Sequence, residues 1–206
     1  HEIATHGYYH QLVYKQTKEE FARDLDKSIS LLTDITNQSI LGYRAPSFSI
    51  VNDSIWALDI IKEAGLKYDA SIFPIQGHDR YGVKEMEPSI HELESGLYEA
   101  PPTTVRFFGK RWPAAGGGYF RLFPYWLTKY FINRLNKKKD RPAVVYLHPW
   151  EFDPDQPRIE EADLFSKFRH YVNLHKTEGK FRRLLQDFKF TSIRDFLNLS
   201  VGDSND

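Results

Sequence analysis

The sequence has no cysteine, only one methionine and no long hydrophobic run. Without cysteine the chain can form neither disulfides nor thiolate–metal bonds, so any metal ion must be held by nitrogen and oxygen atoms, and the cellular compartment stays open. No apolar stretch approaches the roughly 18 residues of a membrane span, and the polar opening at His1 and Glu2 lacks the pattern of a signal peptide. We therefore expect no membrane span in this chain.

A net charge is also missing, because 28 Lys and Arg residues balance 28 Asp and Glu residues. The one basic run, residues 137–139, is typical of a solvated loop. This balance does not favour a polyanion, so we expect no nucleic-acid partner. With 41% hydrophobic residues the chain can bury one core of good size. We predict a single domain over residues 1–200 and a polar tail over residues 201–206.

Helical and strand patterns alternate along the chain. Thr17 begins a capping box ahead of an apolar helical stripe. Prolines interrupt residues 73–124, which we expect to be rich in loops and short strands. The alternation favours the α/β fold class with parallel strands. The predicted helices cover residues 17–33, 52–64, 124–136, 163–172 and 177–188, and the predicted strands residues 40–44, 66–71 and 143–147.

Two histidines, His6 and His10, lie four residues apart near the start of the chain. On a helical turn this spacing brings both side chains to one face, and neutral imidazole is a preferred ligand of zinc and neighbouring transition metals. The pair therefore indicates a candidate metal site. Eight histidines in 206 residues also produce such a spacing by chance, so a pair of surface or core histidines is an equal alternative.

Two further polar residues end predicted strands. Arg44 precedes Ala45 and Pro46, and His148 follows the apolar residues 143–147. Functional groups in parallel α/β folds collect where strands end. His148 is therefore a candidate catalytic residue, with a structural histidine as the alternative.

The glycine run at residues 116–118 lacks the spacing of a nucleotide-binding loop. It predicts a tight turn that a ligand or neighbouring backbone approaches closely, or a packing turn without a ligand. The aromatic residues of the helix that follows, Trp126, Tyr130 and Phe131, are interpreted as core.

Together these separated signals resemble the polysaccharide deacetylases of carbohydrate esterase family four, in the subgroup associated with exosortase-linked exopolysaccharide systems. That family carries an H-x-x-x-H motif, a later R-x-P motif and a late L-H motif, in this order around a distorted (β/α) barrel. The similarity runs over most of the chain. The matching stretches are residues 1–6 (HEIATH), 6–10 (HGYYH), 42–50 (GYRAPSFSI), 68–74 (YDASIFP), 115–121 (AGGGYFR) and 147–151 (LHPWE).

The resemblance implies a metal-dependent hydrolase that removes N-acetyl groups from the amino sugars of a polysaccharide or oligosaccharide. His6 and His10 would hold a divalent ion, Zn²⁺ first with Co, Ni or Mn as alternatives, to polarise the acetyl carbonyl and lower the pKa of water. His148 would donate a proton to the departing amine. Arg44 would orient the catalytic base.

The resemblance adds four further candidate residues. Tyr43, Pro46 and Tyr119 are expected to contact the substrate, although both tyrosines are equally consistent with core aromatics. Asp69 is expected to tune the catalytic histidine, with a strand-end turn aspartate as the alternative.

One family motif has no counterpart in this sequence. Family members begin with a strand that ends in an acidic pair, which supplies the base and the third metal ligand. We therefore expect the chain to correspond to the larger C-terminal part of a barrel that is incomplete at its N-terminus. An open barrel edge would favour a homodimer. Two alternatives stay open: a non-catalytic glycan-binding remnant and a hydrolase of a small cyclic or linear amide.

Overall fold

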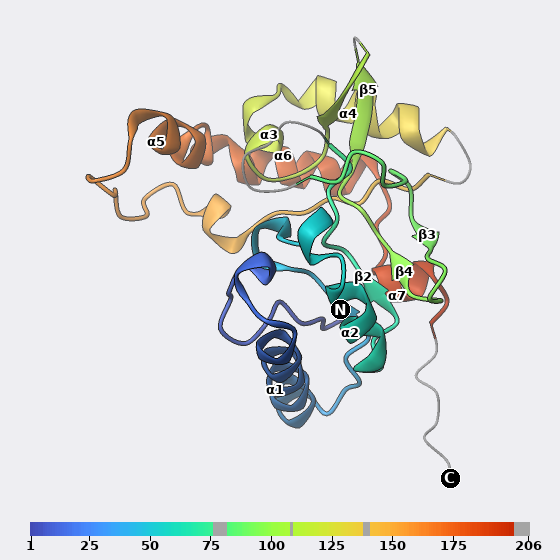
Figure 1. Cartoon of the computed structure of the whole chain (residues 1–206). Helices are drawn as coiled ribbons and strands as arrows, with labels where there is room; N and C mark the ends of the chain where they lie inside the picture. Colours follow the sequence, from blue (N-terminus) through green and yellow to red (C-terminus); the bar gives the residue numbers. More distant parts are fainter. Residues whose placement is uncertain (76–81, 108, 138–140, 200–206) are drawn as a thin grey trace. The chain divides into compact units, whose positions relative to one another are not determined.

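The chain forms two compact units, each with its own hydrophobic core. Figure 1 shows the helices and strands of the chain. The first unit contains residues 1–101 and the segment that starts at Thr191, and the second contains residues 102–190. The predicted tail, residues 201–206, lies outside the described residues. The computed structural model describes residues 1–75, 82–107, 109–137 and 141–199.

A short mixed sheet runs through the first unit. Its strands, in spatial order, are β1 (Gly42–Tyr43), β2 (Tyr68–Asp69), β4 (Tyr98–Glu99) and β3 (His91–Glu92). The first three are parallel, and β3 pairs antiparallel with β4. The register pairs Tyr43 with Asp69, and Asp69 with Glu99. Residues at the carboxyl ends of the parallel strands therefore meet at one edge of the sheet.

The first long helix begins where the sequence predicts. The Glu20 N–H donates to the Thr17 hydroxyl at 3.2 Å, and the Thr17 N–H donates to the Glu20 carboxylate at 2.8 Å. The predicted helix over residues 52–64 is instead divided into a 3-10 turn at residues 52–54 and an α-helix at residues 57–63. The helical elements described in this unit are α1 (Lys18–Thr36), α2 (Ala57–Glu63), α7 (Ile193–Phe196), η1 (Val13–Lys15), η2 (Pro46–Phe48) and η3 (Asn52–Ser54).

The core of the first unit holds α1 against β1. The Phe21 ring makes edge-to-face contacts with Tyr43 and Trp56, with ring centroids 5.6 Å and 5.8 Å apart. Leu25 and Ile61 are fully buried in the same cluster. Burial of each such side chain contributes about 1.5–3 kcal/mol. The packing fixes α1 beside the strand that leads into Arg44.

The second unit combines a β-hairpin with helices. β5 (Thr104–Phe107) pairs antiparallel with β6 (Lys110–Pro113). Phe120, Ile132 and Leu184 form a buried cluster that joins α3, α4 and α6. The helical elements are α3 (Gly117–Leu122), α4 (Tyr125–Asn136), η4 (Pro149–Phe152), α5 (Leu164–Tyr171) and α6 (Leu174–Asp187).

The predicted strand over residues 143–147 is wrong. Within this segment only Tyr146 forms a β-bridge, which is parallel to Gly116. The Val144 carbonyl accepts two hydrogen bonds from Thr103, from its N–H at 3.3 Å and from its hydroxyl at 2.9 Å. The Thr103 side chain therefore supplies one of the two hydrogen bonds to Val144, whereas the hydrogen bonds that pair a regular strand all come from the backbone.

The interpretation of the α4 aromatics as core is also wrong for two of the three. Trp126 is 68% exposed and Tyr130 is 52% exposed, whereas Phe131 is buried. The buried face of α4 consists of Thr128, Phe131 and Ile132, which share one side of a helix. Trp126 and Tyr130 are four residues apart on another face.

The glycine run is explained by packing against a neighbouring segment. A Cβ atom on Gly116 would collide with the Tyr146 ring and lie 2.8 Å from its carbonyl oxygen. Gly117 has a φ of +48°, in the left-handed region. The close approach of neighbouring backbone therefore requires glycine at this turn.

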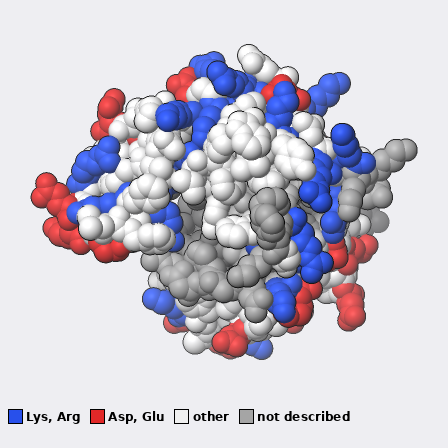
Figure 2. All heavy atoms as spheres, turned by 90° about the horizontal axis from the view of Figure 1, so that it is seen from above, with Lys and Arg blue, Asp and Glu red and all other residues white. Residues whose placement is uncertain are grey.

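The helices and the parallel strands confirm the α/β class, and they are consistent with part of a distorted (β/α) barrel. In the described ranges, no helix is both long enough and apolar enough to cross a membrane. On the face drawn in Figure 2, charged side chains of both signs occur with uncharged side chains between them. This mixture reflects the equal numbers of acidic and basic residues.

Candidate active site

The histidine pair of the first unit lies on an irregular loop rather than on a helical turn. Thr5 forms a parallel bridge with Tyr43. The Thr5 N–H donates to the Gly42 carbonyl at 2.9 Å, and the Arg44 N–H donates to the Thr5 carbonyl at 3.0 Å. The chain therefore runs beside β1 and brings His6 next to Arg44.

A backbone carbonyl orients the imidazole of His6. Its Nδ1 lies 2.5 Å from the Arg44 carbonyl oxygen, which can only accept, so Nδ1 carries the proton and Nε2 carries the lone pair. The His10 ring lies edge-to-face against His6 at 74°, with centroids 4.9 Å apart. His10 has a φ of 54°, and such strained backbone clusters at functional sites.

Asp24, a buried residue of α1, fixes the loop between the two histidines. Its carboxylate oxygens each accept a backbone N–H at 2.9 Å, Oδ2 from Tyr8 and Oδ1 from Tyr9. Gly7 has a φ of +78°, and a Cβ atom there would lie 2.9 Å from Asp24 Oδ2. The Lys27 ammonium lies 3.9 Å from the Tyr8 ring centroid. The loop is therefore held from one side by α1.

The separation of the two imidazole rings is compatible with a pair of ligands for one divalent ion. With zinc–nitrogen bonds of about 2.0–2.1 Å and a tetrahedral angle, the centroids of two ligating rings lie roughly 5 Å apart. The observed separation is 4.9 Å. A carbonyl that accepts from the other ring nitrogen is also the common outer partner of a metal-ligating histidine. Within the described residues, no cluster of three or more His, Cys, Asp or Glu side chains is placed to hold an ion.

A pair of buried carboxyl groups lies at the ends of β2 and β4. Asp69 and Glu99 are both 0% exposed. The Ser71 N–H and hydroxyl donate to Asp69 at 3.0 Å and 2.5 Å, and the Ile72 N–H donates to Glu99 at 3.1 Å. Burial first, and then the negative charge of Asp69, raise the pKa of Glu99 well above its ordinary value. Burial raises the pKa of Asp69 as well, and the proton of the pair therefore resides on Glu99.

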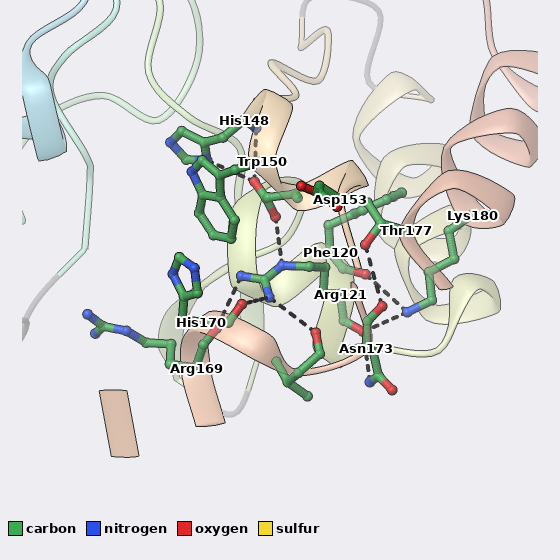
Figure 3. Close-up of polar contacts among 12 residues, drawn as sticks. Phe120, Arg121, His148, Trp150, Asp153, Arg169, His170, Asn173, Thr177 and Lys180 are labelled. Atoms are coloured by element: carbon green, nitrogen blue, oxygen red, sulfur yellow. Dashed lines mark hydrogen bonds and ion pairs between the residues drawn. The ribbon is translucent and has the colours of Figure 1, made fainter. Parts of the chain in front are cut away.

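In the second unit, His148 is held by a carboxylate three residues further along (Figure 3). Glu151 Oε1 accepts the His148 backbone N–H at 2.9 Å and lies 2.8 Å from the ring Nδ1. Because an ionised carboxylate only accepts, Nδ1 carries a proton, and Nε2 is the nitrogen that can gain or lose one. The His148 side chain is 46% exposed, whereas that of Glu151 is fully buried.

Arg121 of α3 compensates the buried charge of Glu151. Its Nε donates to Glu151 Oε2 at 2.7 Å, and the Arg121 side chain is only 2% exposed. Burial alone would raise the pKa of Glu151, but the hydrogen bonds from His148 and the charge of Arg121 outweigh it and hold this pKa below its ordinary value. Glu151 is therefore ionised at neutral pH.

The remaining guanidinium nitrogens of Arg121 cap the end of α5 (Figure 3). Nη1 donates to the carbonyls of His170 at 2.6 Å and Val172 at 3.1 Å, and Nη2 donates to that of Arg169 at 3.1 Å. Carbonyls at a helix C-terminus lack intrahelical donors and favour a nearby cation. Arg121 therefore joins α3, η4 and α5 in one network.

The Trp150 indole lies in a stack between two histidines. Its ring is 5.4 Å from His148 at 22° and 4.3 Å from His170 at 12°, measured between centroids. Burial first, and then the charge of Arg121, lower the pKa of His170. His170 Nε2 lies 2.8 Å from Gln156 Oε1. The neutral His170 ring thus supports the indole, which supports one face of His148.

The structure brings some of the predicted site residues together. His6, His10 and Arg44 are neighbours in the first unit, where Arg44 contacts His6 through its carbonyl. The Arg44 Nε donates to the Ala70 carbonyl at 3.2 Å. His148 lies in the second unit, and the carboxylate that contacts it is Glu151.

The predicted substrate contacts have different environments. Tyr43 is 1% exposed and packs on Phe21, which supports the core alternative for Tyr43, and Pro46 is buried as well. Tyr119 is half-buried, with its ring centroid 5.8 Å from that of Phe123.

The sequence alone does not single out Glu151 and Arg121. A local signal for Glu151 exists, because an acid three residues after His148 in a Pro149-initiated turn has the spacing of a capping box. Arg121 is 30 residues away from Glu151, and this pairing has no local signal.

Two family models match the sequence. Residues 70–198, more than half of the chain, match a domain of unknown function, DUF3473. Residues 1–69 match the family described as polysaccharide deacetylase. The chain belongs to the DUF3473 family, and its first 69 residues are similar to polysaccharide deacetylases. The histidine pair lies in the region that matches the polysaccharide deacetylase family, and His148 lies in the DUF3473 region.

Individual relatives are more distant or match only in part. A peptidoglycan deacetylase-like protein from Gibberella zeae is 35% identical over 78 residues, which are 38% of this chain and 21% of the relative. A candidate polysaccharide deacetylase from Mycobacterium smegmatis has 18% identity and a TM-score of 0.48 over 94% of this chain and 67% of that chain. A CE4 family pseudoenzyme from Bacillus anthracis has 13% identity and a TM-score of 0.45 over 95% and 46%. The matched part of this chain thus spans about a fifth of the Gibberella relative.

Replacing Arg121 by Ala should destabilise the chain strongly. The variant leaves the Glu151 carboxylate buried without its cation, so we expect the free energy of unfolding to fall by about 3–5 kcal/mol. Arg182→Ala is the matched control, because it removes an exposed ion pair with Glu178 and should leave stability nearly unchanged. Urea unfolding at pH 7 measures both variants. Equal, small losses would contradict the role assigned to Arg121.

Replacing Glu99 by Gln should flatten the pH dependence of stability. A carboxyl group whose pKa is raised on folding contributes stability below its ordinary pKa of 4.5 and loses it as the pH rises through the raised value. Between pH 4.5 and the raised pKa, the free energy of unfolding of the wild type should therefore fall by up to about 1.4 kcal/mol per pH unit. That of Glu99→Gln should fall less.

Urea unfolding between pH 5 and pH 9 measures the two slopes. Glu63→Gln, at an exposed position of α2, is the control and should keep the wild-type slope. A wild-type slope in Glu99→Gln would show that Glu99 is already ionised in the folded chain.

Proposed function

We propose that this chain carries the histidine pair of a metal-dependent hydrolase that removes N-acetyl groups from the amino sugars of a polysaccharide, with exopolysaccharide as the substrate class. The match of residues 1–69 to the polysaccharide deacetylase family supports deacetylation as the reaction class. The observation that carries the proposal is the joint orientation of His6 and His10, with centroids 4.9 Å apart and His6 Nδ1 bonded to a carbonyl.

His6 and His10 are the proposed ligands of the ion, Zn²⁺ first with Co, Ni or Mn as alternatives. Imidazole nitrogen is a preferred ligand of zinc and nickel. When bound, such an ion polarises the acetyl carbonyl and lowers the pKa of the attacking water. The chain fixes the ligands in advance, because the Arg44 carbonyl sets the tautomer of His6 and Asp24 holds the loop backbone.

His148 is the proposed proton donor to the departing amine. Hydrolysis adds water across the amide C–N bond and yields acetate and a free amine, which must take up a proton. Glu151 holds Nδ1, so the exchange takes place at Nε2, and its negative charge stabilises the protonated ring. The half-exposed side chain of His148 is accessible to a substrate. The Arg44 guanidinium is the proposed partner of the base, and Tyr119 a proposed sugar contact.

A non-catalytic glycan-binding role is the second candidate. Among the described residues, no third His, Cys, Asp or Glu side chain lies with the two histidines to complete a metal site, and this observation favours the second candidate. Metal binding by the histidine pair separates the two candidates, because a glycan-binding module has no need of it.

Zinc titration by calorimetry tests the proposed metal site. We expect one-to-one binding in the wild type and loss of that binding in His10→Ala, because a single imidazole does not make a site. His175→Ala removes an exposed histidine of α6 and is the control that should bind as the wild type does.

The same affinity in the wild type and His10→Ala would contradict the metal site and favour the glycan-binding candidate. Loss of binding in His175→Ala would place the ion elsewhere.

A further inference from the structure

One peptide group in the first unit is hydrogen-bonded at both ends. The carbonyl of the Arg44–Ala45 peptide accepts from His6 Nδ1 at 2.5 Å. The N–H of the same peptide donates to the Ser71 hydroxyl oxygen at 2.7 Å. The peptide therefore connects the proposed metal ligand His6 to Ser71, which lies just beyond the end of β2.

Ser71 in turn is bound to the buried carboxyl pair. Its hydroxyl donates to Asp69 Oδ1 at 2.5 Å, and its backbone N–H donates to Asp69 Oδ2 at 3.0 Å. A hydroxyl that donates to a carboxylate becomes a stronger acceptor, because hydrogen bonds in a chain polarise one another. The charge on Asp69 thus strengthens the bond from Ala45 to Ser71, and through the peptide it strengthens the Arg44 carbonyl as an acceptor.

Glu99 keeps Asp69 in its ionised form. The two residues are partners in the register of β2 and β4. Glu99 Oε2 is buried without a hydrogen-bond partner among the described residues. Ionised Glu99 would be poorly compensated there, so the proton of the pair stays on Glu99 and Asp69 keeps the charge.

We propose that the Asp69–Glu99 pair is a positioning element for His6, which acts through Ser71 and the Arg44–Ala45 peptide to hold the ring with the proton on Nδ1, the tautomer in which Nε2 is the nitrogen that ligates a divalent metal ion. The inference rests on the proposed function, since it assigns His6 to the metal. Outer hydrogen-bond partners of this kind change metal affinity by about 10- to 100-fold. In this network three hydrogen bonds connect Asp69 to His6, and both residues belong to the first unit.

The tautomer of His6 is the direct test, and it requires no metal. Long-range ¹H–¹⁵N NMR of metal-free protein distinguishes a protonated from an unprotonated ring nitrogen, and His6→Gln identifies the His6 signals. In the wild type we expect a single tautomer with the proton on Nδ1. In Ser71→Ala and Asp69→Asn the carbonyl is a weaker acceptor, so we expect a mixture of both tautomers.

Two further variants separate positioning from loss of stability. Ser54→Ala removes another fully buried serine hydroxyl of the same unit, which bonds to Ser49 and Val51. It should lower stability and leave the His6 tautomer unchanged. Ser71→Thr keeps the hydroxyl and should keep the wild-type tautomer. If Ser71→Ala does not fold, Asp69→Asn and Ser71→Thr carry the test.

Zinc titration of the same variants gives the second readout. We expect zinc affinity about 10-fold or more weaker in Ser71→Ala and Asp69→Asn than in Ser54→Ala. The same tautomer in the wild type, Ser71→Ala and Asp69→Asn overturns the inference, whatever the zinc affinity. A tautomer that depends on Ser71 in a chain that binds no zinc supports the positioning and overturns the proposed metal site. The two failures are therefore distinguishable.

Discussion

The hydrogen bond between His6 Nδ1 and the Arg44 carbonyl is the contact on which the proposed metal site depends. It exists because the bridge between Thr5 and Tyr43 places the start of the chain beside β1, so that His6 directly follows one bridge residue and Arg44 directly follows the other. Asp24 then holds the loop from the side of α1. Two separate parts of the core therefore set the geometry of one exposed loop.

Both units use a buried carboxylate to orient a histidine, and in each the negative charge is compensated differently. In the second unit Glu151 contacts His148 directly, and Arg121 supplies the opposing charge. In the first unit Asp69 acts on His6 through a path of three hydrogen bonds. Its neighbour Glu99 holds a proton, so that two negative charges are not buried side by side. The ion pair between Arg121 and Glu151 and the proton on Glu99 both reduce the free-energy cost of burying carboxyl groups.

The sequence predicts features whose cause is local, and it fails where the cause is distant. The start of α1 follows from a capping box at Thr17, and the position of Arg44 follows from a strand that ends before a proline. By contrast, the apolar residues 143–147 do not form a strand, because pairing partners on other segments decide that outcome. Arg121 could not be assigned to Glu151, since that pair joins segments 30 residues apart. The histidine spacing predicts a helical turn, whereas both rings lie on an irregular loop.

The most direct test of the proposed site is X-ray absorption spectroscopy of the zinc-loaded chain, alongside His10→Ala. The account predicts a first shell of nitrogen and oxygen at about 2.0–2.1 Å, with outer-shell scattering from two imidazole rings in the wild type and from one in the variant. Scattering from fewer than two imidazoles in the wild type, or an unchanged spectrum in His10→Ala, would contradict the assignment of His6 and His10 as ligands of one ion.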